Sequence, residues 1–343
     1  MAYITFQPKD HFNTVLYTGD GSSSDRTITG VGFQPDWLWN KSRSNAYNHY
    51  IFDVLRGTNM LSSNALTADE DKSPQFSALT SDGFTIRNDA GSLAINANGV
   101  TFANWCWKAG GAGSSNSDGS ITSTVSANTT AGFSIISWTG SGNNKTIGHG
   151  LGAVPKYILI KNLTDSSDWI VYHHVLGNAS FLHLNTTDNE QAGTGIFNST
   201  TPTSSVISLG SDNKSNGTND NMIAYAFAEK TGFSHFNVYR GNNSTDGSFV
   251  YTGFKPALIL SKRNSAGNSW SLIDNKRPGY NVTDKYLLPD TSATDQSTAV
   301  DILSNGFKFR TSAGNHNAAS SYYYAAFAEA PLVGSNNVPS TAR

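Results

Sequence analysis

The sequence predicts an all-β protein built from three tandem β-sandwich-like or jelly-roll-like modules that arose by internal triplication. Short alternating or apolar runs, broken by Gly, Asn, Asp and Ser, recur along all 343 residues, and runs with helical spacing are nearly absent. An apolar segment that follows a proline is written three times, as GFQPDWLWNKSR, LGAVPKYILIKN and TGFKPALILSKR. Each copy ends in an aromatic and small-residue run, as ANWCWKAG, AYAFAEKTG and AAFAEAP. The length of the repeat suits one small domain.

The spacing inside the repeat is nearly constant and places the module boundaries. Almost the same interval separates the module proline from the last bulky residue of each copy, which runs from Pro35 to Trp107, from Pro155 to Phe227 and from Pro256 to Phe327. We therefore predict module 1 at 1–110, a Gly/Ser-rich linker at 111–132, module 2 at 133–229, module 3 at 230–329 and a C-terminal arm at 330–343. The front half of the linker is expected to be flexible, although 121–125 also fits an edge strand.

Each module is expected to use three recognisable strands. An alternating strand opens it, at 12–19, 133–140 and 233–241. The strand after the proline is apolar on both sides, which indicates a central strand covered on two faces. The closing strand carries Trp105 and Trp107 on one face and Cys106 on the other, and the later copies repeat bulky and small residues in this order. We expect the bulky face in a sandwich core, the small face open to another layer, and Cys106 to act as a small apolar side chain.

Composition excludes several classes of protein. Charged residues make up 14% of the chain, against about 25% in an average soluble domain. The net charge of −2 and the lack of a basic block argue against nucleic acid. No apolar run approaches the roughly 20 residues of a membrane helix, no signal peptide is visible, and one cysteine cannot form an intrachain disulfide framework. These features predict a protein that folds in a reducing cytoplasm and acts outside it without secretion, as virion proteins do.

A family resemblance points the same way. The set YTGDG, GFQPDWLWNKSR, SDGFTI, NWCWKAG, FSIISWTG and AYAFAEKTGFS, which extends over about 17–334, resembles uncharacterised domains of virion structural proteins from marine phages. The resemblance implies a particle component encoded among structural genes, without a recorded active site. It leaves open a position on the head, in the tail or in a fibre.

Candidate contact residues divide into lysines and aromatics. Lys41, Lys161 and Lys262 each follow the module proline at the same distance. They suit either triplicate anion or glycan contacts or, as we favour, lysines at the exit of a buried strand that pair with a carboxylate or reach solvent. The aromatic candidates for a partner or glycan surface are Trp37, Trp39, Tyr322 and Tyr324, with the whole 322–324 run expected to expose one ring or to bury it in a partner.

Residue patterns for catalysis, a cofactor or a metal are weak. Asp53, His173 and Asp274 occupy matching positions, but the histidine interrupts a repeated carboxylate, and two carboxyls at a fixed spacing do not recur. No histidine recurs in all three copies. We predict no catalytic, cofactor or metal site.

The sequence thus predicts a non-enzymatic phage virion structural protein, displayed on the particle surface. A head decoration or head-attached appendage is favoured over a tail or fibre component. Its expected partners are capsid or tail proteins, with host surface glycans and a homo-oligomer left open, and without nucleic acid or membrane insertion. The alternative is a glycan-binding adhesin of the tail or fibre, and a capsule depolymerase is the least favoured class.

Overall fold

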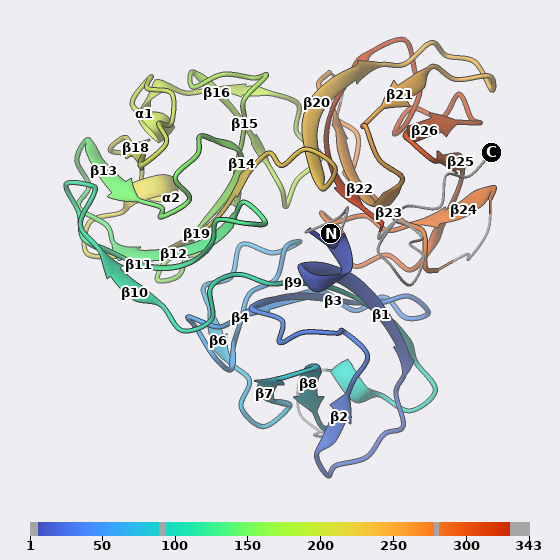
Figure 1. Ribbon diagram of the computed structural model, residues 1–343, viewed down its shortest axis with the longest axis horizontal. Coiled ribbons are helices and arrows are strands. Elements are labelled where there is room, and N and C mark those ends of the chain that lie inside the picture. The colour runs from blue at the N-terminus through green and yellow to red at the C-terminus, as the bar shows by residue number, and fades with distance from the viewer. Residues whose placement is uncertain (1–5, 89–93, 266, 278–280, 330–343) are drawn as a thin grey trace, which may run out of the picture.

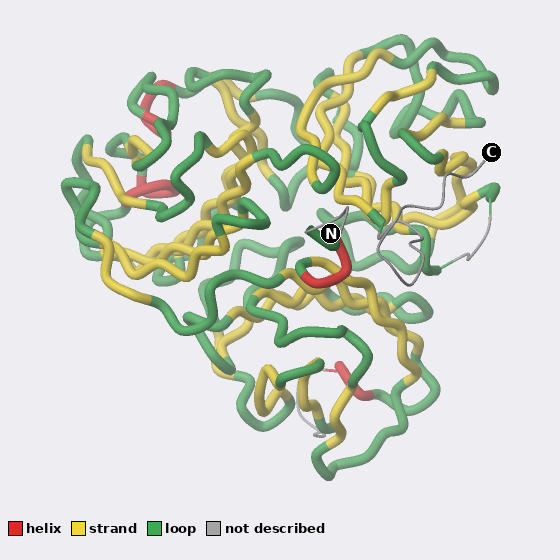
Figure 2. The backbone as a smooth tube through the Cα atoms, in the orientation of Figure 1, coloured by secondary structure: helices red, strands yellow, loops and turns green. Residues whose placement is uncertain are grey.

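The protein is all-β, as the sequence predicts. The computed structural model describes residues 6–88, 94–265, 267–277 and 281–329. Strands joined by turns make up three lobes around a common centre (Figure 1), here called lobe 1 (12–107), lobe 2 (114–228) and lobe 3 (234–328). The described helices are short (Figure 2): η1 (Pro8–Asp10), η2 (Ala94–Asn96), α1 (Thr194–Phe197) and α2 (Asn213–Asn216).

Lobe 1 is a sandwich of two sheets. Its strands are β1 (Phe12–Thr18), β2 (Arg26–Ile28), β3 (Trp37–Ser42), β4 (His49–Asp53), β5 (Asn59–Met60), β6 (Glu70–Asp71), β7 (Phe76–Thr80), β8 (Gly83–Ile86) and β9 (Thr101–Trp107). The inner sheet has the order β1-β9-β3-β4 and the outer sheet the order β2-β8-β7, while β5 and β6 pair with each other. Apolar side chains from both sheets, among them Leu38, Phe76 and Phe84, form the core between them.

Lobe 2 has a larger inner sheet of its own. Its strands are β10 (Ser114–Asn116), β11 (Ser123–Asn128), β12 (Phe133–Thr139), β13 (Lys145–Gly148), β14 (Pro155–Asn162), β15 (Ile170–His173), β16 (Ser180–His183), β17 (Gln191–Ala192), β18 (Val206–Leu209) and β19 (Asn221–Ala228). They form the sheets β10-β11-β12-β19-β14-β15-β16-β17 and β13-β18. The part of the linker that we expected to be flexible instead contains β10, because β10 and β11 add to the edge of β12.

Lobe 3 consists of two four-stranded sheets. Its strands are β20 (Ser234–Arg240), β21 (Phe249–Tyr251), β22 (Pro256–Arg263), β23 (Ser271–Asp274), β24 (Thr283–Tyr286), β25 (Gln296–Leu303), β26 (Gly306–Phe309) and β27 (Ser321–Ala328). The sheets are β20-β27-β22-β23 and β21-β26-β25-β24. The predicted C-terminal arm lies outside the described residues.

One strand order recurs in the inner sheets. An opening strand pairs with the closing strand, the closing strand with the strand after the proline, and that strand with the next one along the chain. The post-proline strands β3, β14 and β22 are buried along nearly their whole length and paired on both sides. This confirms the prediction of central strands, because a strand covered on both faces needs apolar residues at every position.

The closing strands face the opposite way from our prediction. In lobes 1 and 2 the bulky side chains of the closing strand pack at the molecular centre, whereas the small ones pack in the core of their own lobe. In lobe 3, Phe327 lies at the centre, but Tyr324 packs on Phe307 of the second sheet. Cys106 belongs to the core of lobe 1, and Ala224 and Ala226 to that of lobe 2. The residues facing the lobe's own core can be small because the second sheet supplies bulky side chains there, as Phe76 and Phe84 do in the core that contains Cys106.

Candidate functional site: the junction of the three lobes

Three rings from the closing strands meet at the centre of the molecule. We call Trp107, Phe227 and Phe327 the aromatic trio; they are the last residue of β9 and the next-to-last residues of β19 and β27. Their ring centroids lie 6.4 Å apart for Trp107 and Phe227, and 5.4 Å apart for each of the other two pairs. All three are buried. Aromatic pairs at such separations add about 0.5–1.5 kcal/mol each beyond their area burial.

The space around the trio is filled rather than open. A void of about 10 Å³ remains there, lined by the trio and by apolar side chains from β3, β14 and β22. A water molecule needs at least roughly 10–15 Å³ and two or more polar partners. The junction is therefore a packed core and has no room for a substrate.

One set of polar contacts starts from the positions of Asp53, His173 and Asp274. Asp53 Oδ2 accepts the Tyr225 hydroxyl of lobe 2 at 2.7 Å. His173 Nε2 donates to the Tyr324 carbonyl of lobe 3 at 3.2 Å. Asp274 Oδ2 accepts from Trp105 Nε1 of lobe 1 at 3.1 Å. Each lobe thus uses the same position to contact the next lobe, and the third contact returns to the first.

Arginines neutralise the two carboxylates. Arg56 Nε lies 2.6 Å from Asp53 Oδ2, and Arg277 Nε lies 2.7 Å from Asp274 Oδ2. The aspartates were recognised from the sequence and these arginines were missed, although an arginine three residues after each aspartate was a visible signal. Burial lowers the pKa of His173 to about 3, so its ring is neutral and Nδ1 accepts the Val175 amide.

A second set uses ring N–H groups in the opposite direction. His49 Nε2 donates to the Leu288 carbonyl at 2.9 Å, from lobe 1 to lobe 3. The two equivalents are indoles, and their bonds are Trp169 Nε1 to the Ser62 carbonyl and Trp270 Nε1 to the His183 carbonyl, both 2.8 Å. His49 Nδ1 accepts from Trp39 Nε1, and burial holds the pKa of His49 well below its usual value. A neutral imidazole can therefore take the place of an indole.

Backbone hydrogen bonds form a third set at the same interfaces. The acceptors are carbonyls of the residues that follow β3, β14 and β22 by the same spacing. The pairs are Asp295 N with Arg43 O at 3.0 Å, Asp69 N with Leu163 O at 3.2 Å, and Glu190 N with Asn264 O at 3.5 Å. Each of the three interfaces contains one bond of this set.

The three candidate lysines are buried at these interfaces. Lys161 Nζ donates to the carbonyls of Leu66 in lobe 1 and Ser167 in its own lobe, at 2.9 and 2.8 Å. Lys41 Nζ donates to Ser292 of lobe 3 and to Ser42, and Lys262 Nζ to Asn268. Burial lowers the pKa of each lysine to about 8. Their acceptors are carbonyl oxygens and not the carboxylate that the sequence allowed. Glu229 and Glu329, at the ends of the closing strands, pair with Lys156 and Lys255.

The four aromatic candidates are buried as well. Trp37 and Trp39 pack in the central cluster, Tyr322 stacks on Tyr239, and the Tyr324 hydroxyl contacts His235 Nδ1. Side chains enclosed in this way offer no surface to a glycan or a partner protein. The predicted contact set, lysines and aromatics together, is therefore corrected: its residues build contacts between and within the lobes.

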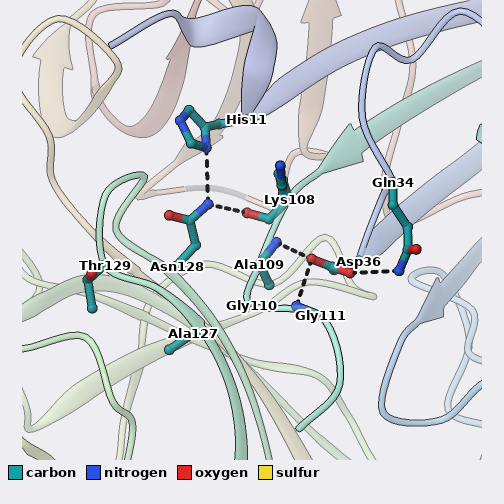
Figure 3. Close-up of a pocket in the computed structure, with 10 residues that line it drawn as sticks. All are labelled: His11, Gln34, Asp36, Lys108, Ala109, Gly110, Gly111, Ala127, Asn128 and Thr129. Atoms are coloured by element: carbon teal, nitrogen blue, oxygen red, sulfur yellow. Dashed lines mark hydrogen bonds between the residues drawn. The ribbon is translucent and has the colours of Figure 1, made fainter. Parts of the chain in front are cut away.

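A cleft of about 580 Å³ lies where the chain leaves lobe 1 for lobe 2 (Figure 3). His11, the loop before β3, the residues after β9 and the end of β11 line it. Asn128 Nδ2 contacts His11 Nδ1 at 3.0 Å and the Lys108 carbonyl at 3.1 Å, as Figure 3 shows. Asp36 Oδ2 accepts the amides of Ala109 and Gly111 at 2.8 and 3.1 Å.

The polar side chains of this cleft hold the chain that connects lobe 1 to lobe 2 in position. Burial raises the pKa of Asp36, although the two backbone amides oppose that shift. Burial lowers the pKa of His11, and Lys108 lowers it further. The Asp36 carboxylate and the His11 ring nitrogen already bind neighbouring groups, so the visible contacts hold the exit of lobe 1 in place.

The residues that the structure describes contain no group of three or more His, Cys, Asp or Glu side chains placed to hold a metal ion. Nor do they contain a helix with the length and apolar character that crossing a membrane requires.

Comparison with known proteins places the chain in a family. Residues 7–331 match the family described as Domain of unknown function (DUF7483), which covers nearly all of the described structure. No curated protein matches the chain, and no solved structure matches it either.

Proposed function

The chain belongs to the DUF7483 family, and we propose that it is a non-enzymatic structural protein displayed on a phage particle. In this proposal, the three lobes are copies of one β-sandwich-like module. They form a pseudo-trimer within a single chain, and that compact body is the functional unit.

Internal triplication is supported by strand order and register together. The closing strand lies between the opening strand and the post-proline strand in every lobe. Equivalent residues pair in the same register: Trp37 with Trp107, Tyr157 with Phe227, and Leu258 with Phe327. The second sheets differ more, with three, two and four strands, as expected for copies that keep the shared interface and vary outside it.

The observation that carries the proposal is the closed set of contacts between lobes. Each of the three contact types occurs once per interface. Within one type, all three contacts run around the centre in the same rotational sense, although that sense is opposite for the first and second types. Identical subunits that contact head to tail close into a ring when the rotation per step fits. Here covalently linked lobes make such a ring, and the aromatic trio fills its middle.

A single-chain pseudo-trimer suits a particle surface. One copy can occupy a site of threefold symmetry that would otherwise need three chains, which favours a head decoration or head-attached appendage over a tail or fibre component. The low charge content and the Ser, Thr, Asn and Gly enrichment fit a surface that binds other virion proteins with little electrostatic contribution. The resemblance to phage virion domains supports the same location.

The proposal that the protein is non-enzymatic is supported by the contacts of its buried polar residues. Asp53, Asp274 and His173 bind side chains or carbonyls of a neighbouring lobe. Repetition of these contacts accounts for three copies, whereas a single catalytic centre would not require them.

Purified particles provide the test. Particles of a phage that encodes this chain are banded on a density gradient, and their proteins are quantified by mass spectrometry and located by electron cryomicroscopy. We expect a constant ratio of this chain to capsid protein, and a three-lobed density on the outer surface. A chain that is made in infected cells but is absent from banded particles would contradict the proposal.

The host-surface adhesin remains the second candidate because one strand of lobe 3 exposes two aromatic rings. Phe249 and Tyr251 are both exposed on β21. They are not among the contact residues that the sequence suggested.

A further inference from the structure

We propose that the outer face of lobe 3 carries a binding site for neutral carbohydrate, built on Phe249 and Tyr251 of β21. The inference is independent of the particle role, since the site lies away from the lobe junction. β21 and its neighbour β26 lie in the lobe at the upper right of Figure 1. Phe249 is 47% and Tyr251 62% exposed, while Val250 between them is buried. Residues two apart on a strand point to one face, so the two rings share a surface.

Glycines allow these rings to lie along the sheet. Tyr251 is paired with Gly306 of β26, which has no side chain on that face. A Cβ atom added at Gly306 would come within 2.8 and 2.9 Å of two ring carbons of Phe249, so this ring lies over the glycine. At Gly253, an added Cβ would lie 3.6 Å from the Tyr251 hydroxyl oxygen. Both rings therefore lie beside glycine backbone on the exposed part of β21, where a ligand can reach them.

Polar groups border the rings. Lys308 stands opposite Phe249 on β26, and Asp301 stands opposite Lys308 on β25. Asp246 lies 2.8 Å from Lys308 Nζ and 2.9 Å from Arg310 NH1, and Arg310 Nε lies 2.6 Å from Asp301. These two cations and two anions hold one another in fixed positions beside the rings, and their charges sum to zero.

The size and net charge of this surface indicate which class of ligand it can bind. A stable protein complex buries about 800 Å² on each partner, which two rings with a short polar border do not supply. The balanced charges give no net attraction to a phosphate backbone or to an acidic polymer. A neutral sugar has an apolar C–H face for the rings and hydroxyls at its edge for the carboxylates and cations. Neutral carbohydrate is therefore the ligand class that matches both features.

Direct titration tests the site. The purified full-length chain is titrated with neutral gluco-, manno-, galacto- and xylo-oligosaccharides, and binding is followed by calorimetry and by saturation-transfer NMR. Oligothymidylate and oligo-alginate serve as anionic comparison ligands. We expect saturable binding of at least one neutral oligosaccharide, and a roughly three- to tenfold loss of affinity in each of Phe249→Ala and Tyr251→Ala.

Matched variants separate stacking from general apolar contact. Val154 of lobe 2 is 46% exposed, so Val154→Ala removes a similarly exposed apolar group elsewhere and should leave binding unchanged. Phe249→Tyr keeps a ring and should retain affinity, whereas Phe249→Leu keeps apolar character and should lose it. Phe249, Tyr251 and Val154 are all exposed, so each variant should unfold at the temperature of the parent chain.

Three results would overturn the inference. One is the lack of binding by every neutral oligosaccharide up to its solubility limit. Another is binding that survives both ring-to-Ala variants. The third is preferential, salt-sensitive binding of oligothymidylate or alginate, which would mark an anion site instead. A Tyr251→Ala chain should still enter particles, so failure of this site and failure of the particle role give distinct results.

Discussion

Lys41, Lys161 and Lys262 show how the repeat uses a charged side chain inside the protein. Each ammonium group is enclosed and donates to one or two backbone carbonyls, and for Lys41 and Lys161 one of these carbonyls belongs to another lobe. Burial disfavours the charged form, which explains the pKa values of about 8. A neutral amine still has two N–H groups, so it can keep two carbonyl bonds after losing its proton.

These lysines make the free energy of unfolding depend on pH in the alkaline range. An unfolded lysine titrates near 10.4 and these titrate near 8, so the unfolded chain binds more protons between those values. The free energy of unfolding should therefore rise from about pH 7.5 to about pH 9.5, below the range where unfolded tyrosines ionise. Urea titrations at a series of pH values check this. Lys161→Met should reduce the slope, and a slope that is flat or falling in the parent chain would be inconsistent with buried lysines.

Arg277 is the residue whose removal should be most costly among the ion pairs. Its guanidinium and the Asp274 carboxylate are both enclosed, so Arg277→Met leaves an unpaired buried charge. We expect a loss of about 3–5 kcal/mol in the free energy of unfolding, measured with urea. Lys255→Met, which breaks the exposed pair with Glu329, is the matched control and should cost about 0–1 kcal/mol. Equal losses in the two variants would refute a special role for the buried pair.

At the residue scale, sequence patterns predicted where a side chain lies better than which group it contacts. Cys106 was expected to serve as a small apolar side chain, and it is buried in the core of lobe 1, where burial raises its pKa. A carboxylate or solvent was expected around the lysines, but their acceptors are backbone carbonyls, some nearby in the chain and others in another lobe. Such acceptors have no side-chain signature, because every residue type supplies the same backbone oxygen.

The closing strands show what periodicity can and cannot predict at the element scale. Alternation correctly divided Trp105 and Trp107 from Cys106 across the two faces of β9. Alternation did not predict which face of the strand packs in its own lobe and which packs against the other lobes, because both faces are apolar and buried. Only the relative placement of three sheets decides this, and that placement is a tertiary property.

The trio at the ends of these strands can be tested by truncation. Trp107→Ala removes a large buried ring from the place where three strands converge, so unfolding should become easier by about 3–5 kcal/mol. Phe249→Ala removes an exposed ring and should change stability by no more than about 0.5 kcal/mol. Chemical denaturation of both variants gives the comparison. A Trp107→Ala chain as stable as Phe249→Ala would show that the centre is not packed as described.

The linker illustrates a second limit of sequence reasoning for elements. The Gly and Ser content of its front half indicated a flexible connection, yet β10 lies there and continues the inner sheet of lobe 2. β11 overlaps the segment 121–125, for which an edge strand was also expected. Backbone hydrogen bonds to an existing sheet edge stabilise strands of low intrinsic β-propensity. A free edge on β12 provided that template, and its availability depends on the fold of the residues that follow.

At the scale of the whole molecule, the lobes behave as parts of one body. Each contact type between lobes starts at a fixed place in the repeat and ends on a different lobe, so no lobe has its complete set of partners alone. The short strands and turns of the sequence predicted the fold class of each lobe. They did not predict the rotation that relates one lobe to the next and closes the ring. That rotation depends on the shapes of three complementary surfaces, which no single stretch of sequence encodes.

Differential scanning calorimetry of the full chain tests this account most directly. If the lobes share the central cluster and its buried ion pairs, they should unfold together in one transition, with equal calorimetric and van't Hoff enthalpies. Trp107→Ala should move that single transition to lower temperature without splitting it. Two or three independent transitions in the parent chain, each with the enthalpy of about one lobe, would contradict the account.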